Sequence, residues 1–173
     1  MNRVTSILGP WADFDAIPPA VLANAARRGT AFHAAAAAYA RGLFPIVDAD
    51  FAGFFESFTH WFDRYVKKVY FVEEELIDEV LGFGGHPDIG LQLIDGRNMV
   101  VDWKTPAVAS GSWPLQVSAY LHLANKKYDG LFGGCMALQP HKSGGPAKAT
   151  VYNYSHNHFA IFLSALNCYK YFK

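Results

Sequence analysis

The chain has 173 residues, of which 51% are hydrophobic, 16% aromatic and 17% charged, which predicts one globular domain and excludes an intrinsically disordered chain. Fifteen basic residues balance fifteen acidic ones, so net charge does not indicate a polyanionic partner, although lysines can still gather on one face. Cys135 and Cys168 have no CxxC spacing, which predicts neither a zinc nor an iron–sulfur framework and favours a reducing compartment. Because there is no membrane-spanning apolar run and no secretion-signal core, we expect a cytoplasmic protein without a membrane partner.

Two helices are predicted first. Pro18 and Pro19 open a helix that continues to about Gly42, with Gly29 as a weak point inside it. A second helix is predicted over residues 48–68, where aromatic side chains recur at helical spacing. The ordinary amphipathic period favours a core-facing stripe over a surface for base stacking. The stripe consists of Phe51, Phe54, Phe55, Phe58, Phe62 and Tyr65.

Strands and further helices follow these two. They are a strand that becomes acidic (69–85), a hairpin (about 86–105), a helix (112–127), two strands (130–140 and 148–155) and a last helix (156–173). Ser112 is the expected cap of the helix at 112–127, and Pro114 lies in its first turn. The order predicts an α/β fold with a central mixed β-sheet flanked by α-helices, in one domain over residues 1–173. Within it, N-terminal helices at 18–67 precede a core at about 68–173.

The hairpin places three charges among apolar residues. Asp88, Asp102 and Lys104 have even numbers, whereas the odd-numbered strand positions are all apolar and are expected to face the core. A three-residue turn, Asp95–Arg97, aligns both odd-numbered sets and places Lys104 opposite Asp88 and Asp102 opposite Gly90. The three charges then converge on the other face. The apolar set is Ile89, Leu91, Leu93, Met99, Val101 and Trp103.

Two interpretations of this charged patch remain open. One is a solvated polar face with a salt bridge between Lys104 and either Asp88 or Asp102. The other is a divalent-metal site, since two neighbouring carboxylates repel one another unless a cation lies between them. Their hard oxygen ligands suit Mg²⁺ or Mn²⁺. Lys104 would then stabilise charge on a phosphate or position an attacking water.

The sequence HPD followed by DWK resembles the signature of the PD-(D/E)XK nuclease superfamily, with Pro87-Asp88 and Asp102–Lys104 in its conserved places. Other elements, in the expected order, resemble the RecB-type exonuclease branch, which includes small stand-alone nucleases of phages and bacteria. Over residues 27–120 these elements are His33 in RRGTAFHAA, Glu73 in FVEEEL, the turn GFGGHPD, and Gln116 and Tyr120 in LQVSAY.

The resemblance implies a restriction-endonuclease-like core and a Mg²⁺- or Mn²⁺-dependent deoxyribonuclease site. The implied metal ligands are His33, Asp88, Asp102 and the backbone carbonyl of Trp103. The implied catalytic set is Asp88, Asp102, Lys104, Glu73, Gln116 and Tyr120. Each of these residues also has an ordinary structural interpretation. Their occurrence together, in the order expected of the family, favours a nuclease site.

The roles that the resemblance implies differ among these residues. Lys104 would orient or activate the nucleophilic water. Gln116 and Tyr120, four residues apart on one helical face, would position the lysine or the DNA backbone. Glu73 would be an outer acidic ligand, with its neighbours at 74–75 as alternatives.

The function expected from the resemblance is an exonuclease acting on DNA in recombination, repair or phage DNA processing. The alternatives are a structure-selective endonuclease on the same fold and a catalytically inactive DNA-binding or scaffold protein. No iron–sulfur cluster is expected, because the four cysteines of some RecB-type relatives are absent. DNA is the expected partner, with other recombination or replication proteins as further partners and no specified oligomeric state. Phosphate contacts, unless they are solvated helix ends, would come from Arg27, Arg28, Lys67, Lys68, Lys126 and Lys127.

Overall fold

In the computed structural model, which describes residues 1–11, 18–153 and 155–173, the first long helix begins at the two prolines. This helix, α2, spans Pro19–Ala40 and runs through Gly29 without a break. Gly42 follows its end with a φ of 81°, a left-handed conformation that glycine adopts without a steric cost. Both predicted ends of the helix are therefore confirmed within two residues.

The second helix is shorter than predicted. A 3₁₀ turn, η2 (Ala49–Phe51), leads into α3 (Ala52–Tyr65), and the chain then continues as strand β2 (Val66–Val72). The predicted helix end at residue 68 is wrong because residues 66–68 pair with a neighbouring strand. The core-facing stripe is confirmed, since Phe58 is fully buried and only Tyr65 at its end is exposed.

A five-stranded mixed sheet forms the centre of the fold. Its strand order is β2-β5-β6-β7-β8, in which β6 and β7 are parallel and the other neighbours are antiparallel. The strands that follow β2 are β5 (Ile89–Leu93), β6 (Asn98–Trp103), β7 (Gly134–Gln139) and β8 (Lys148–Val151). Residue 154, near the end of the last predicted strand, lies outside the described residues.

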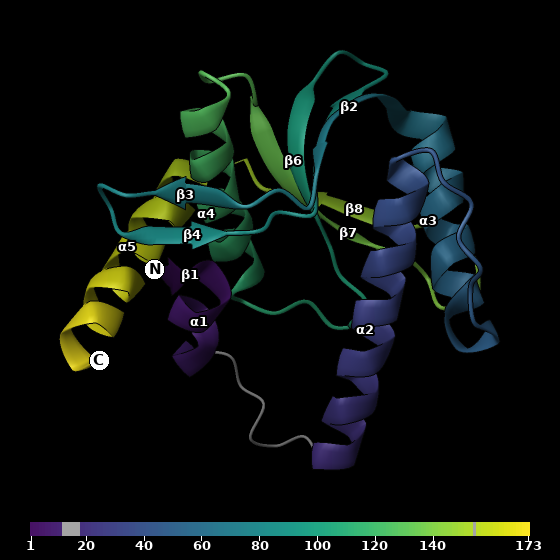
Figure 1. Cartoon of the computed structure of the whole chain (residues 1–173), viewed down its shortest axis with the longest axis horizontal. Coiled ribbons are helices and arrows are strands. Elements are labelled where there is room, and N and C mark those ends of the chain that lie inside the picture. The colour runs from purple at the N-terminus through teal and green to yellow at the C-terminus, as the bar shows by residue number, and fades with distance from the viewer. Residues whose placement is uncertain (12–17, 154) are drawn as a thin grey trace.

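Helices cover both faces of this sheet (Figure 1). On one face, Phe32 of α2 and Phe58 of α3 pack with Ile89 and the other odd-numbered hairpin residues. On the other, Val100 packs with Val117 and with helices α4 (Trp113–Lys127) and α5 (Ser155–Phe172). The predicted α/β class and mixed sheet flanked by helices are confirmed. The face that carries the hairpin charges is therefore also covered, and it is not a solvated surface.

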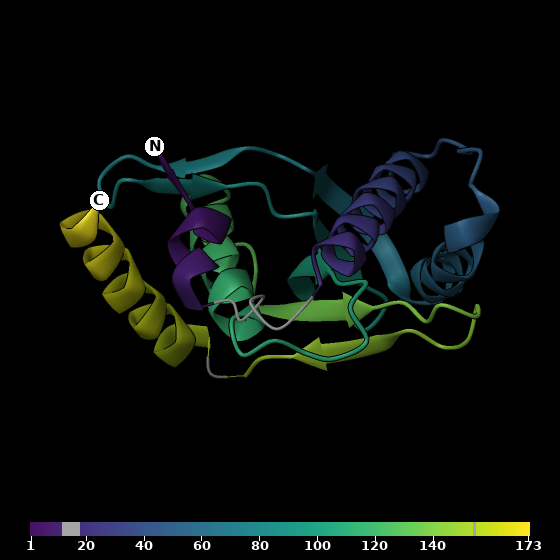
Figure 2. The same cartoon turned by 90° about the horizontal axis from the view of Figure 1, so that it is seen from below.

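A second, smaller sheet was not expected from the sequence. The segment predicted as one strand over 69–85 continues after β2 as two short strands, and the N-terminus supplies a third, in the order β1-β4-β3. These elements are β1 (Asn2–Arg3), followed by α1 (Val4–Leu8) and η1 (Gly9–Trp11), then β3 (Leu76–Asp78) and β4 (Phe83–Gly85). Both termini lie on the α4–α5 side of the molecule (Figures 1 and 2).

Ser112 precedes α4 as predicted, but its side chain makes no capping hydrogen bond and lies 2.8 Å from the Ser110 hydroxyl instead. Within the described ranges, no helix combines the length and the apolar character that crossing a bilayer requires.

Candidate metal centre and its lysine

The hairpin brings Asp88 and Asp102 to the same level of the sheet. β5 and β6 pair Ile89 with Val101 and Gly90 with Val100, and one further step brings Asp88 level with Asp102. The predicted register, with Asp102 opposite Gly90, is therefore wrong by two residues.

The turn that sets this register contains residues 94–96. The Leu93 amide donates to the Arg97 carbonyl, and the Gly96 amide donates back to the Leu93 carbonyl. The turn still has three residues, so the division of the hairpin into two faces is unchanged. All six odd-numbered apolar residues are buried in one cluster, as predicted.

Asp88 lies just before β5 and is held by two contacts. Its Oδ2 accepts a hydrogen bond from the Trp103 amide at 2.6 Å, and its Oδ1 lies 3.0 Å from His33 Nδ1. The residue is only 6% exposed, so the carboxylate is fixed rather than freely solvated. The Trp103 side chain is buried in the core, and the predicted role of its carbonyl stays a prediction.

Lys104 is held between α4 and the sheet. Its ammonium lies 2.5 Å from Asp102 Oδ2 and donates to Gln116 Oε1 at 2.8 Å. Gln116 Nε2 in turn donates to the Tyr120 hydroxyl at 3.2 Å. The two α4 residues selected from the sequence thus form one chain of contacts with the lysine.

Trp113 also contacts the lysine, and the sequence reasoning did not select it. Its ring centroid lies 5.7 Å from Lys104 Nζ, within the range of a cation–π interaction, and the side chain is buried. Its position one turn before Gln116 on the same helix was a signal that could have identified it.

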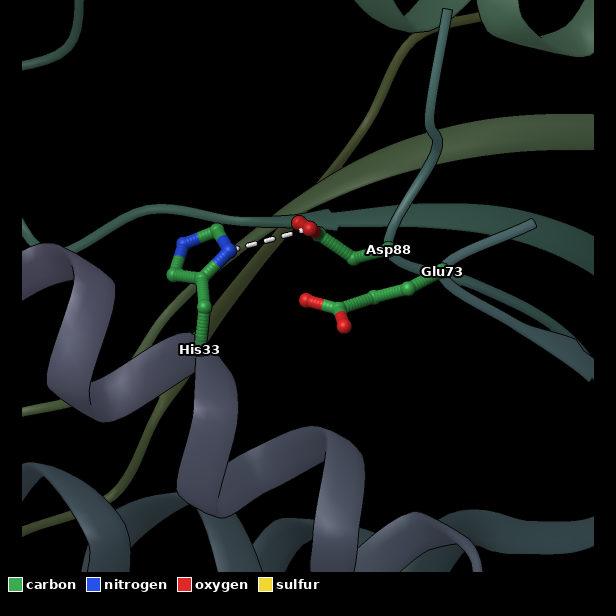
Figure 3. Close-up of side chains that lie close together, drawn as sticks. All are labelled: His33, Glu73 and Asp88. Carbon is green, nitrogen blue, oxygen red and sulfur yellow. Dashed lines mark hydrogen bonds and ion pairs between the residues drawn. The ribbon is translucent and has the colours of Figure 1, made fainter. Parts of the chain in front are cut away.

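Glu73 joins His33 and Asp88 in a compact group. One possible ligand atom from each of these three residues lies within 4.8 Å of the other two. In Figure 3 the carboxylates of Glu73 and Asp88 approach the ring of His33, which projects from α2. The three elements that meet here are α2, the end of β2 and the start of β5.

The backbone explains why Glu73 differs from its neighbours. Glu73 has a φ of 48°, an uncommon left-handed value for a residue other than glycine, and its amide donates to the Asp88 carbonyl at 2.8 Å. Glu74 instead accepts hydrogen bonds from Lys127 and Tyr128, and Glu75 lies 3.4 Å from a histidine, His86. Of the three candidate glutamates, Glu73 is the one brought to the centre.

The electrostatics of the centre follow from burial and charge. Burial lowers the pKa of His33, but the charge of Asp88 and the hydrogen bond to it outweigh this effect and raise the pKa to about 9. Burial raises the pKa of Asp102 above its usual range, although the charge of Lys104 opposes the shift. Burial and the nearby charge of Asp102 also raise the pKa of Tyr120, so its hydroxyl is neutral at physiological pH.

The donor set fits a hard divalent cation. Two carboxylates and one imidazole are ligands that Mg²⁺ or Mn²⁺ accept, with His33 neutral when it binds a metal. Asp102 Oδ2 is buried, and no described group meets it with hydrogen-bond geometry even though Lys104 lies close. Asp102 is not part of the three-residue group, so the structure brings together a different set from the implied ligands: Glu73 lies inside and Asp102 lies beside it.

The six candidate phosphate contacts fall into different environments. Lys126 forms an ion pair with buried Asp78 at 2.6 Å, and Lys127 contacts Glu74, so both lysines are engaged within the protein. Lys67 and Lys68 are exposed on edge strand β2, which corrects their assignment to a helix end.

The two arginines are on α2. Arg27 is exposed, whereas the guanidinium of Arg28 stacks over Phe54 at 5.4 Å. Both line a pocket of about 400 Å³ with Asp48 and Asp50, so local carboxylates accompany their positive charges.

Comparison with known proteins yields no assignment. No protein-family model matches this chain, and a search of curated proteins finds no match.

Proposed function

We propose that this chain is a Mg²⁺- or Mn²⁺-dependent deoxyribonuclease of the PD-(D/E)XK type, with a restriction-endonuclease-like core. The observation that carries the proposal is the position of Lys104, held by Asp102 and Gln116, beside the His33–Glu73–Asp88 group. A ligand set for a cation next to an oriented, half-buried ammonium is a combination that can catalyse phosphodiester hydrolysis.

The metal would be held by Asp88 and Glu73, with His33 and the adjacent Asp102 as further ligands. Bound there, a divalent cation would polarise the phosphate and lower the pKa of a bound water. Hydrolysis forms a P–O bond to the water oxygen and breaks one P–O ester bond. The water gives up a proton, and the leaving oxygen takes one from solvent.

Lys104 contributes orientation and positive charge. An ammonium has three N–H donors, of which one is directed to Gln116, while Asp102 lies beside it as an ion-pair partner. The side chain is 14% exposed, so a remaining donor can reach a phosphate oxygen or the attacking water. Gln116 and Tyr120 position the lysine, because their hydrogen bonds hold it against the sheet.

A purely structural salt bridge explains the site less well. The buried carboxylates of Asp88 and Asp102 contact His33 and Lys104, and the exposed carboxylate of Glu73 adds a third negative charge to the group. Carboxylates this close together repel one another, and a divalent cation between them removes that repulsion.

The test is a nuclease assay with end-labelled linear DNA and with covalently closed circular DNA, in Mg²⁺, in Mn²⁺ and in chelator. We expect metal-dependent loss of linear DNA by the native protein and none by Asp102→Asn. An exonuclease, which we favour, leaves closed circles intact, whereas a structure-selective endonuclease cuts them. Native protein that leaves all substrates intact in both metals would contradict the proposal.

A further inference from the structure

A second pocket is lined in part by Tyr120, which helps to position the proposed catalytic lysine, and the proposed mechanism does not use it. It has a volume of about 320 Å³, near the lower end for ligand sites. Tyr120 forms part of its wall, and the same residue belongs to the contact chain that ends at Lys104. Its lining consists of Arg3, Val4, Thr5, Gly85, His86 and Tyr120.

The pocket is assembled by backbone pairing rather than by loose surface side chains. β1 runs parallel to β4, with Arg3 level with Gly84, and the fully buried Val4 anchors the segment. A Cβ atom at Gly85 would lie 2.6 Å from the ring of Tyr120, so only glycine allows this close approach. The first residues of the chain are thereby fixed beside the segment that carries Asp88.

The lining favours an anion. Arg3 is exposed, and no described carboxylate forms an ion pair with it, unlike Lys126 or Lys127. The exposed Thr5 supplies a hydroxyl donor, and His86 contributes a ring that lies 3.4 Å from Glu75. A guanidinium with neighbouring donors is a geometry that suits phosphate oxygens.

We infer that this pocket binds a phosphate group of the DNA substrate, adjacent to the phosphate that is cleaved, with Arg3 as its principal contact. The inference rests on the proposed function, because it places a second substrate phosphate beside the Lys104 site. The phosphate can be a terminal monoester or a backbone diester, which share the same oxygen acceptors. Binding there would hold the scissile phosphate in register with Lys104.

The experiment measures fluorescence anisotropy of short single-stranded oligodeoxynucleotides in chelator, where no hydrolysis occurs. The strands carry a 5′-phosphate, a 3′-phosphate or hydroxyls at both ends. We expect Arg3→Gln to weaken binding about tenfold, the loss of one charge-assisted contact, with Arg3→Lys intermediate. A loss confined to one phosphorylated strand identifies a terminal phosphate, and an equal loss on all strands identifies the backbone.

Arg64→Gln is the matched control, since Arg64 is an exposed arginine in the last turn of α3, before the opposite end of β2. Thermal melting checks that each variant is folded. If Arg3→Gln binds every strand as tightly as Arg64→Gln does, phosphate binding by Arg3 in this pocket is contradicted. If the native protein still degrades DNA in that case, the proposed function survives; native protein that neither binds nor degrades DNA overturns both.

Discussion

Two buried aspartates in this protein each contact a histidine and have a lysine nearby, yet their surroundings differ. Asp78, at the end of β3, accepts from Lys126 at 2.6 Å, from the Leu81 amide at 3.0 Å and contacts His122 at 2.9 Å. The ring of His122 stacks on Phe159 at 4.3 Å. One carboxylate is thus fully satisfied, and it ties the small sheet to α4.

Asp88 is also buried, but further carboxylates lie close to it. Glu73, which is exposed, and Asp102, which is buried, add two further carboxylates beside His33 and Lys104. The difference teaches that a buried His–Asp pair is not by itself a functional site. A cluster of three carboxylates beside an oriented lysine distinguishes the proposed site from the structural pair.

The largest expected effect is a difference in DNA-degrading activity between variants of the two lysines, Lys104 and Lys126. Lys104→Ala removes the ammonium beside the proposed metal ligands, and we expect metal-dependent DNA degradation to fall by at least about 100-fold. Lys126→Ala, which removes the lysine of the structural pair, should keep activity within about twofold. The measurement is the initial rate on end-labelled DNA, with circular dichroism to confirm folding.

Equal activity in the native and Lys104→Ala proteins would contradict the mechanism. A similar loss in both lysine variants would instead indicate that stability, rather than the position of Lys104, controls the rate.

The next effect concerns metal binding. At Mn²⁺ concentrations well above the dissociation constant, binding to the folded state should raise the Tm of the native protein by roughly 5 to 10 °C. Asp88→Asn should lose this increase, because it removes a ligand charge at the centre of the group. Thermal melting with and without Mn²⁺ measures the shift.

Asp78→Asn is the matched control, since it changes the other buried aspartate. It should lower the Tm in chelator but keep the increase with Mn²⁺. A native protein whose Tm does not respond to Mn²⁺ or Mg²⁺ would contradict the metal centre.

The smallest effects are two opposite dependences of stability on pH in metal-free protein. Burial lowers the pKa of His33, but Asp88 raises it to about 9. The stability that protonated His33 adds is therefore complete below about pH 6.5 and is lost as the pH rises through 9. Burial raises the pKa of Asp78, but its bonds to Lys126 and His122 lower it far more, so the stability gained there is lost as pH falls below about 4.

Urea unfolding of His33→Gln and Asp78→Asn against the native protein measures both effects. We expect the native advantage over His33→Gln to shrink by about 2 kcal/mol on the alkaline side, and that over Asp78→Asn by a similar amount on the acid side. A His33→Gln difference that is constant between pH 6 and 10 would contradict the protonated state assigned to His33.

The sequence predicted much of the site because local patterns carry the information. Alternation along the hairpin separated the charges from the apolar core, and the QxxxY spacing placed Gln116 and Tyr120 on one side of α4. The register was wrong by two residues because any even shift preserves the alternation. The resemblance selected Glu73 with residues 74–75 as alternatives, and only the structure separates them, through a left-handed residue at the end of β2.

Periodicity by itself predicted most of the helices and the two faces of the central hairpin, since each depends on neighbours close in sequence. Only the tertiary structure decided which charges neutralise one another. Lys126 and Asp78 lie 48 residues apart and Lys127 and Glu74 lie 53 apart, so no local pattern could identify them as paired. Long-range pairing of strands likewise brings β1 beside β4, and this pairing places Arg3 at the wall of the proposed phosphate pocket.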